Sequence, residues 1–365
     1  MVQNFEPAPL RGGLAPSAPT MQDVARLAGV SAKTVSNVVN GNPNVSERTR
    51  ASVERAIAHL GYKMNVTARN LRRGTTGLIA LALPELRNPY FAELADSIVS
   101  HAEASNYRVL ITQTGYTREG ELEVLVGSQH HLVDGVIFSP VQLGPEDVRQ
   151  FAVEFPLVVL GESVFDTGND HVTMSNVEAA RAATEHLIGL GRRRIALLGV
   201  APDVTTGASG LRRRGYVDAL VAHQLPVLNE LQIPTGWWQL SSGAEATKGL
   251  IRSGIPFDAI FALNDSLALG ALSELTRAGL RIPEDVAVIG FDDTEAVHFS
   301  NPPLSSVEPG RESIARMSVE MLLRRITQRK DAEDSAPRRV EVPFAVKVRQ
   351  STLGHDEEQE AGSSR

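Results

Sequence analysis

Two different hydrophobic periods divide the chain at about residue 75. Upstream, between residues 20 and 62, apolar side chains recur every three or four positions, as they do in short amphipathic helices. Downstream, short apolar runs alternate with longer amphipathic stretches, which is typical of the strands and crossover helices of a parallel, doubly wound sheet. The pattern therefore predicts a small all-α headpiece followed by a larger α/β core.

The first half of the headpiece is predicted to be a helix-turn-helix. Thr20 and Asp23 have the spacing of a capping box, and Gly29 stands where a tight turn needs a positive φ. Ser31 then caps a second helix. The side chains expected to face inward are Val24, Leu27 and Ala28 on the first helix and Val35, Val38 and Val39 on the second. Two short helices joined in this way have the geometry of a DNA-binding motif.

A third helix is expected after a loop at residues 40–43. Ser46 opens this helix and Gly61 ends it. Its inward side chains, Val53, Ala56, Ile57 and Leu60, complete a small core. We therefore assign residues 20–64 to one compact headpiece, with a disordered lead-in at residues 1–19.

Charge sets the headpiece apart from the rest of the chain. Residues 20–74 contain nine Lys or Arg against three acidic residues, a net charge of +6. Since the whole chain carries −7, the remainder carries −13. A basic segment on an otherwise acidic protein indicates a polyanionic partner.

The first half of the core contains four strong strand candidates and one weaker one. The strong candidates are TGLIALALP, YRVLITQTG, VDGVIFSP and PLVVLGES, and the weaker candidate is HVTMS, at residues 171–175, which we place at the edge of the sheet. Helices are expected at residues 89–105 and 119–131.

The second half repeats this βαβ pattern weakly. Its strands are RRIALLGV, DAIFALND and VAVIGFDD, and its helices are expected at residues 176–190, 214–223, 244–253 and 267–278. A helix at residues 311–327 and a strand near residues 340–348 follow both halves, so the chain crosses between two lobes more than once. We assign residues 76–175 plus 307–336 to the first lobe, residues 176–306 plus 337–353 to the second, and residues 354–365 to a disordered tail.

Composition excludes several classes of function. The chain has no cysteine, so it has neither disulfides nor thiolate sites. It has no P-loop, no GxSxG and no HExxH motif, and the adjacent pair His130 and His131 points in directions about 100° apart on a helix, which suits a solvated helix end better than a metal site. We expect no enzymatic activity, no cofactor and no metal. With no secretory signal and no apolar run long enough for a membrane helix, we expect a cytoplasmic protein without a membrane partner.

Polar residues at strand ends are the candidates for a ligand site. In open α/β sheets ligands bind beyond the carboxyl ends of the strands, and two facing lobes form a cleft there. An Asn or Asp in such a position also caps the following helix, and capping is the interpretation that we prefer for Asp265, Asp293 and Asn176. The remaining candidates are Asn88, Tyr90, Phe91, Gln142, Arg212, Asn264 and Asp292.

Several motifs in a fixed order resemble the LacI/GalR family of bacterial transcriptional repressors. They are DVARLAGVSAKTVSNVVNG, the hinge ARNLRRG, NPYF at residues 88–91, LRRRGY, ALNDSLALGAL and IPEDVAVIGFDD. The resemblance covers residues 20–353. It implies a homodimer that binds a double-stranded, pseudo-palindromic DNA operator through its headpieces, a hinge helix within residues 65–75, and a core similar to periplasmic sugar-binding proteins that closes on a small effector, expected to be a saccharide.

The resemblance also implies which residues contact DNA. Ala32, Lys33 and Asn37 match the base-reading positions, and an Asn amide can bond adenine through two hydrogen bonds. Many relatives have Arg where this chain has Asn37, so the operator half-site cannot be transferred from them. Leu71 matches a position that wedges into the minor groove, although it could instead pack against the core. Ser31, Thr34, Arg48, Arg69 and Arg72 are expected to hold phosphates or to surround Leu71 with positive charge.

For the effector, Arg212 and Asp292 match positions that hold ligand hydroxyls. A guanidinium offers a fork of donors and a carboxylate accepts from two adjacent hydroxyls. Trp238 matches an aromatic residue that stacks on a sugar ring, with a core tryptophan as the alternative. Asn264 is expected to contact the ligand or fix Asp292, and Arg311 to form a salt bridge in the cleft or to recognise an acidic ligand group. The other wall is expected to contain Tyr90, Phe91, Phe138 and Gln142.

The sequence leaves several questions open. It does not name the effector or its charge, distinguish an inducer from a co-repressor, spell the operator, or separate a dimer from a higher oligomer. A solute-binding protein or an enzyme on the same two-lobed fold is the alternative function.

Overall fold

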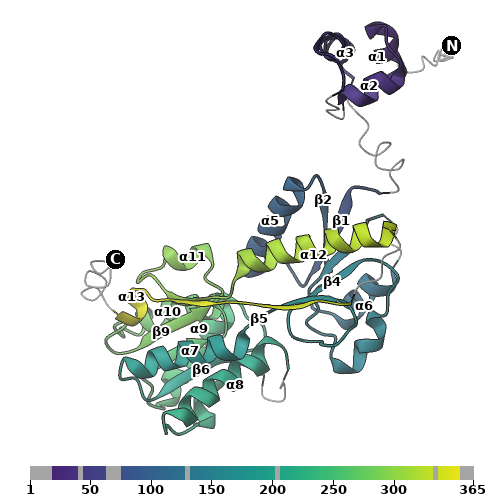
Figure 1. The fold of residues 1–365 in the computed structure, drawn as a ribbon. Helices are drawn as coiled ribbons and strands as arrows, with labels where there is room; N and C mark the ends of the chain where they lie inside the picture. Colours follow the sequence, from purple (N-terminus) through teal and green to yellow (C-terminus); the bar gives the residue numbers. More distant parts are fainter. Residues whose placement is uncertain are drawn as a thin grey trace, which may run out of the picture. The chain divides into compact units, whose positions relative to one another are not determined.

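The computed structural model describes residues 19–39, 44–62, 75–127, 132–201, 206–331 and 336–353 (Figure 1). The chain divides into two compact units, residues 1–74 and residues 75–365, each with its own hydrophobic core. The predicted hinge and tail, and nearly all of the predicted lead-in, fall outside the described residues.

The headpiece contains the three expected helices, α1 (Met21–Ala28), α2 (Ala32–Val39) and α3 (Glu47–Leu60). The capping box at the start of α1 is confirmed, because the Thr20 backbone N donates to Asp23 Oδ2 at 2.9 Å and the Asp23 backbone N donates to Thr20 Oγ1 at 3.3 Å. Gly29 ends α1 with φ 67°, and Ser46 caps α3. These local signals fix where each helix begins and ends.

One predicted core residue of the headpiece is on the surface. Leu27 is 51% exposed, whereas Ala25 is buried beside Val24. Positions 21, 24, 25 and 28 form one face of a helix with 3.6 residues per turn, and position 27 lies on its flank. The core itself is closed by Val35 and Val53, which are fully buried.

The first lobe of the core is built on a six-stranded, entirely parallel sheet of order β11-β5-β4-β3-β1-β2. Its strands are β1 (Leu78–Leu83), β2 (Arg108–Gln113), β3 (Val136–Phe138), β4 (Leu157–Leu160), β5 (Asp170–Met174) and β11 (Arg339–Val342). The prediction of an edge strand at residues 171–175 was wrong, because β11 pairs with the outer side of β5.

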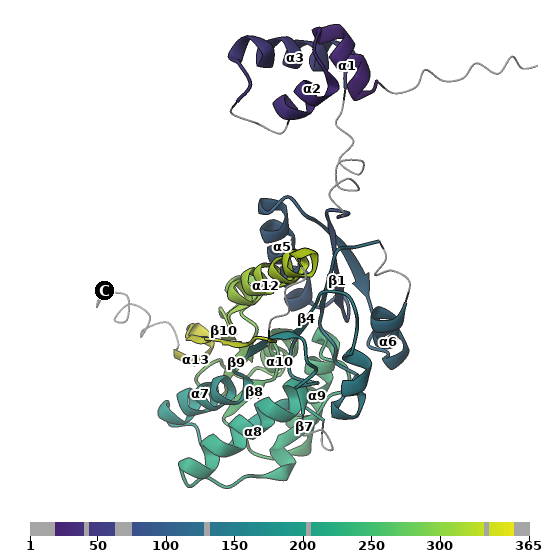
Figure 2. The same cartoon turned by 45° about the vertical axis from the view of Figure 1, so that its right-hand side comes forward.

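Helices cover both faces of this first sheet. On one face lie α5 (Pro89–Ala104) and α12 (Arg311–Asp331), which run side by side (Figure 2). The other face is covered by α6 (Arg118–Val126) and the 3-10 helix η2 (Pro145–Phe151). The inner strands are buried on both sides, which explains their continuous apolar sequences, whereas the edge strand β2 is largely exposed.

The second lobe repeats the three-layer arrangement. Its sheet has the order β12-β10-β9-β8-β6-β7, and only the pair β10 and β12 is antiparallel. The strands are β6 (Ile195–Val200), β7 (Gln232–Pro234), β8 (Ala259–Ala262), β9 (Ala287–Phe291), β10 (Ser305–Glu308) and β12 (Ala345–Lys347). One face packs against α7 (Asn176–Gly189) and α8 (Gly207–Ala222), and the other against α9 (Leu240–Ser253) and α10 (Asp265–Arg277). Shorter elements are η3 (Asn229–Leu231), α11 (Glu295–His298) and α13 (Gln350–Leu353).

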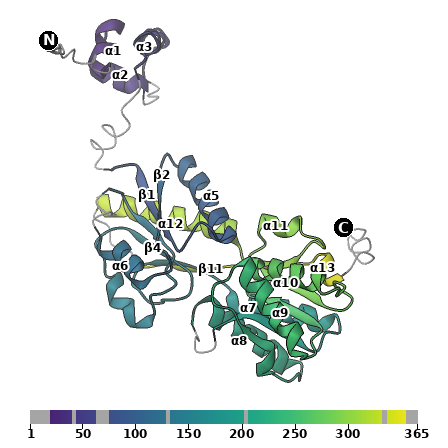
Figure 3. The ribbon, with the colours of Figure 1, turned by 180° about the vertical axis from the view of Figure 1, so that it is seen from behind.

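The chain crosses between the lobes three times: after β5, after β10, and between β11 and β12 (Figure 3). The predicted late strand is thus two strands in two sheets, separated at Pro343, which has no N–H to donate to a ladder. The second and third crossings follow residues 308 and 342, whereas we expected the lobe boundaries at residues 307 and 337. None of the helices within the described ranges is both long and apolar enough to cross a membrane.

Candidate functional site

The surface of the headpiece carries the residues predicted to contact DNA. Lys33 and Arg48 are exposed, and Asn37 is partly exposed. Ser31 caps α2, since its Oγ accepts from the Thr34 backbone N at 3.1 Å and lies 2.9 Å from the Thr34 hydroxyl. Ala32 is partly buried against the headpiece core. The predicted hinge residues Arg69, Leu71 and Arg72 lie outside the described residues.

A cavity of about 560 Å³ lies between the two lobes of the core. The first lobe contributes residues that follow β1, β2, β3 and β4, and the second lobe contributes residues from α8, from the segment before α9 and from the end of β9. Of the nine predicted effector residues, six line it: Tyr90, Phe91, Gln142, Arg212, Trp238 and Asp292. The lining lies beyond the carboxyl ends of strands, as the parallel sheets predict.

Arg212 on α8 is the only basic residue among the described residues that line the cavity. It is 3% exposed, and its Nε donates to Asn176 Oδ1 at 2.7 Å while Nη1 donates to the Leu263 carbonyl oxygen. The guanidinium also lies 3.5 Å from the centre of the Phe291 ring. Burial lowers the pKa of Arg212, and nearby carboxylates oppose this shift. Its Nη2 lies 3.4 Å from Met174 Sδ, a weak acceptor, so Nη2 is the part of the fixed donor fork that a ligand can engage.

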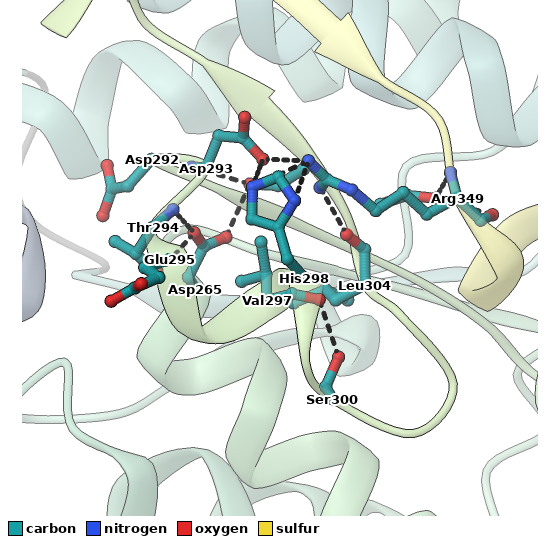
Figure 4. A network of polar contacts seen from close by, with 12 residues as sticks. Asp265, Asp292, Asp293, Thr294, Glu295, Val297, His298, Ser300, Leu304 and Arg349 are labelled. Atoms are coloured by element: carbon teal, nitrogen blue, oxygen red, sulfur yellow. Dashed lines mark hydrogen bonds and ion pairs between the residues drawn. The ribbon is translucent and has the colours of Figure 1, made fainter.

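Asp292 directly follows β9 and faces Arg212 at 3.8 Å between Oδ1 and Nη1. Its backbone has φ 112° and that of Asp293 has φ 48°, two left-handed conformations in a row that an ordinary residue adopts only under constraint. The two side chains point in opposite directions, Asp292 away from the polar network and Asp293 into it (Figure 4). Burial raises the pKa of Asp292 to about 7, against the opposing effect of Arg212 and Arg311.

A polar network holds the turn after Asp292 (Figure 4). The Asp265 carboxylate accepts from the Thr294 backbone N at 2.8 Å and from the Ser306 hydroxyl at 2.6 Å. Arg349 pairs with Asp293 at 2.7 Å. Our interpretation of Asp265 and Asp293 as helix caps was wrong, because both brace the turn that presents Asp292.

Three of the predicted effector residues do not line the cavity. Phe138 is fully buried on the far face of its sheet, stacked on Phe151 under η2. Asn264 caps α10 by accepting from the Leu267 backbone N at 2.9 Å, and its side-chain N donates to the Trp238 carbonyl oxygen at 3.2 Å. Its role is thus to anchor the tryptophan segment.

Arg311 also lies outside the lining. Its Nη2 pairs with Glu93 Oε2 at 2.9 Å, and its Nη1 donates to the Asp292 carbonyl oxygen at 2.9 Å. Arg311 thus forms a salt bridge, with Glu93 as the partner, but the pair lies outside the cavity lining and not in the cleft as we predicted. A guanidinium engaged in this way is not available to an acidic group on a ligand.

The sequence prediction missed several lining residues. Glu162, the first acidic residue after β4, is 6% exposed and accepts from the Met174 backbone N at 2.8 Å. Burial raises its pKa to about 7. Tyr116, Trp237, Glu85 and Glu146 also line the cavity. Glu162 could have been found from the sequence, because it is a polar residue that follows a strand, as the other candidates are. Asn176 was interpreted as a helix cap, and that interpretation was wrong, because its side chain orients Arg212.

Trp238 lines the cavity and is fixed there by the N–H of its indole ring. Its Nε1 donates to the Gly199 carbonyl oxygen at 3.0 Å, and its ring lies 5.6 Å from the Arg212 guanidinium. Gly199 has φ 109°, and a Cβ there would lie 2.8 Å from Leu267 Cδ1 and 3.2 Å from the indole nitrogen. The close approach therefore requires a glycine, and the indole presents a preformed apolar face to the cavity.

The charge of the lining favours an uncharged ligand with many hydroxyl groups. Among the described residues, four carboxyl groups (Glu85, Glu146, Glu162 and Asp292) and one guanidinium line the cavity. Ionised carboxylates repel anions, and a carboxyl group hydrogen-bonds to a hydroxyl whether it is ionised or, as the raised pKa values of Glu162 and Asp292 allow near pH 7, protonated. Within the described residues, no group of acidic or histidine side chains is placed to hold a metal ion.

Two sequence profiles match the chain. The profile described as bacterial regulatory proteins, lacI family, matches residues 20–65. The profile described as a periplasmic binding protein-like domain matches residues 184–352. Catabolite control protein A of Priestia megaterium is 33% identical over 335 residues, covering 91% of this chain and 99% of the relative. The transcriptional regulator CelR of Thermobifida fusca is 34% identical over 347 residues, covering 91% and 98%.

Solved structures extend the similarity. A LacI-family regulator from Sanguibacter keddieii is 45% identical, with a TM-score of 0.70 and coverage of 75% of this chain and 98% of that chain. The CelR–cellobiose complex gives 31% identity and a TM-score of 0.66, covering 91% and 99%. The Lac repressor dimer bound to operator and an anti-inducer gives 29% identity and a TM-score of 0.75, covering 92% and 99%.

Proposed function

This chain belongs to the LacI family of bacterial regulatory proteins, and we propose that it is a repressor whose affinity for a DNA operator is controlled by a saccharide in the interlobe cavity. The observation that carries the proposal is the buried pair Arg212 and Asp292 in the interlobe cavity, on a chain that also carries a basic helix-turn-helix. The relatives are named as regulators, which supports a regulator rather than an enzyme.

On the DNA side, α2 is the helix that enters the major groove. Lys33 and Asn37 read base edges, and Ala32 adds a methyl contact reduced by its partial burial. Ser31, Thr34 and Arg48 hold phosphates and set the register. From the sequence alone, we add a minor-groove wedge at Leu71 flanked by Arg69 and Arg72.

A homodimer supplies the two headpieces that a pseudo-palindromic operator requires. The Lac repressor structure is titled a dimer bound to operator. Two apolar surfaces of the core support self-association. The edge strand β2 exposes Leu110 and Ile111, and Phe299 is 81% exposed beside a groove between α10 and the segment after α11. Unpaired edges and large exposed apolar side chains are typical of interfaces.

The effector is a neutral saccharide. A sugar ring can give its hydroxyl hydrogens to Asp292 and Glu162, accept from Arg212 and place its apolar face on Trp238. A phosphorylated or acidic sugar would meet four carboxyl groups and one guanidinium. The related CelR was solved with cellobiose, which supports this class of ligand.

The effector changes operator affinity through the arrangement of the lobes. A ligand can shift an equilibrium only as far as its affinities for the two states differ. Arg212 and Asp292 belong to the second lobe, whereas Tyr90 and Glu162 belong to the first. A ligand bound to both lobes therefore favours one lobe arrangement over the other.

Two experiments test this proposal. Selection of genomic DNA fragments on the purified protein, followed by footprinting, should yield a pseudo-palindromic site. A thermal-shift screen should show stabilisation by neutral sugars and none by the corresponding phosphosugars, because a bound ligand raises the apparent stability. Selection of no specific sequence would contradict the DNA-binding function, and stabilisation by phosphosugars alone would contradict the ligand class.

A further inference from the structure

Trp237 is a large aromatic side chain whose position no part of the proposed site explains. It is 57% exposed, although its neighbour Trp238 is anchored in the cavity wall. The Trp238 backbone carbonyl is held by Asn264, so the segment that carries Trp237 is fixed. A tryptophan kept at the surface by a fixed backbone is typical of a recognition site.

Tyr116 contacts Trp237 from the opposite lobe. The two ring centres are 5.1 Å apart at an interplanar angle of 66°, an edge-to-face arrangement. Tyr116 follows β2 with φ 56°. The contact joins the first and second lobes, and both rings line the interlobe cavity.

The cavity is graded from a buried polar end to an exposed aromatic end. Arg212, Asp292 and Glu162 are between 3% and 6% exposed, whereas Trp237 is more than half exposed. The lining also contains the carboxyl groups of Glu85, which adjoins the end of β1, and of Glu146 in η2, which is exposed. The volume of about 560 Å³ leaves room for more than one pyranose ring.

We propose that Tyr116 and Trp237 form an outer subsite that binds the second sugar ring of a disaccharide or longer glycoside. This inference rests on the proposed saccharide effector. The C–H groups on one face of a pyranose are attracted to the electron-rich face of an aromatic ring. The hydroxyls around the ring edge need acceptors, and Glu85 and Glu146 supply them. An aryl group would use the rings but leave these carboxylates without donors.

Three substitutions at or near Trp237 test the outer subsite. Trp237 and Trp238 are its only tryptophans, so the intrinsic tryptophan fluorescence of the protein arises in the cavity wall. Trp237→Ala removes the outer ring, and Trp237→Phe restores an aromatic face. Leu240→Ala is the control, since Leu240 is 56% exposed and close in sequence but does not line the cavity.

The test is calorimetric titration of the full-length wild type and the three variants. The probes are glucose, galactose, cellobiose, maltose, lactose and 4-nitrophenyl β-glucoside. We expect a disaccharide to bind the wild type at least about tenfold more tightly than its own monosaccharide. Trp237→Ala should remove that advantage without changing monosaccharide affinity. Trp237→Phe should restore most of it, and Leu240→Ala should leave it unchanged.

Any other result of these titrations contradicts either the outer subsite or the saccharide effector. A monosaccharide that binds as tightly as its disaccharide, or a disaccharide advantage that survives Trp237→Ala, contradicts the outer subsite and leaves the proposed function standing. An advantage limited to the nitrophenyl glucoside shows that the subsite takes an aryl group instead of a sugar. Binding of none of the probes contradicts the saccharide effector, and the subsite proposal falls with it.

Discussion

Arg311, the first residue of α12, donates a hydrogen bond of 2.9 Å from Nη1 to the carbonyl oxygen of Asp292. Its Nη2 pairs with Glu93 on α5, and the other carboxylate oxygen of Glu93 accepts from the Glu295 backbone N at 3.0 Å. Glu93 belongs to the first lobe, and Asp292 and Glu295 belong to the second. The backbone of Asp292 is therefore held at its positive φ by a contact between the lobes. The side chain of the same residue is the carboxylate proposed to bind the effector.

Arg311→Met is expected to weaken effector binding although Arg311 does not line the cavity. The change removes a charged hydrogen bond to the Asp292 backbone and leaves Glu93 without its ion-pair partner, so we expect a loss of about 1 to 2 kcal/mol in binding free energy. Calorimetry on the saccharide found in the thermal-shift screen measures this. Arg316→Met is the control, because Arg316 pairs with Glu320 on the exposed side of α12 and does not contact the cavity lining. Wild-type affinity in Arg311→Met would contradict the positioning role.

Stability should fall as pH rises because Glu162 is buried. Burial raises its pKa from 4.5 to about 7, so between these values the folded protein holds a proton that the unfolded chain releases. The free energy of unfolding therefore decreases with rising pH in this window. Between about pH 5 and pH 8 the wild type should lose about 2 kcal/mol more than Glu162→Gln.

Urea unfolding of the two proteins at both pH values measures this difference. Glu185→Gln, on the surface of α7 in an ion pair with Arg181, should behave like the wild type. Parallel pH profiles for the wild type and Glu162→Gln would show that Glu162 is ionised in the folded protein throughout the range.

Two headpiece substitutions should differ in kind. Asn37→Ala should cost about 1 to 3 kcal/mol at one base pair of the operator and relax specificity there. Arg48→Ala should weaken binding to all sequences alike and reduce the dependence on salt. Gel shifts on a set of single-base operator variants at several salt concentrations distinguish the two effects. An equal loss on every operator for Asn37→Ala would contradict its base-reading role.

Phe299→Glu should weaken the dimer. A buried Phe contributes about 1.5 to 3 kcal/mol, and a two-fold interface contains the residue twice, so the dissociation constant should rise at least about a hundredfold. Sedimentation velocity over a range of concentrations measures this. Val126→Glu is the matched control, since Val126 is 69% exposed at the end of α6. Two variants with the wild-type oligomeric state would rule out Phe299 as an interface residue.

Much of the fold could be predicted because its signals are local. Thr20, Ser46 and Gly29 act within a few residues of their own helices, and the apolar runs of the inner parallel strands indicate that these strands are buried on both faces. The location of β11 could not be predicted. Pro343 divides a single stretch in which apolar and charged residues alternate, and only the tertiary fold decides that the two pieces join different sheets.

The site could be predicted where a polar residue follows a strand and faces the cavity directly, as Asp292 illustrates. Arg212 lies within α8, and the family resemblance identified it. The site could not be predicted where two adjacent polar residues follow the same strand and have different roles. Asn264 and Asp265 are both polar residues at one strand end, yet one caps α10 and the other braces the Asp292 turn. Phe138 shows the same limit in a strand, because alternation gives two faces and does not identify the face that meets the cavity.

The central claim is that the cavity controls DNA binding, and it is tested most directly by titrating one saccharide from the screen into the protein bound to a fluorescent operator. Fluorescence anisotropy gives the operator dissociation constant with and without the sugar. We predict a change of at least about fivefold in the wild type. Asp292→Ala should bind the sugar 1.5 to 3 kcal/mol more weakly, about as expected for a lost charged hydrogen bond, and should need correspondingly more sugar for the same change. An operator affinity that stays constant when the sugar saturates the wild-type cavity would contradict the account.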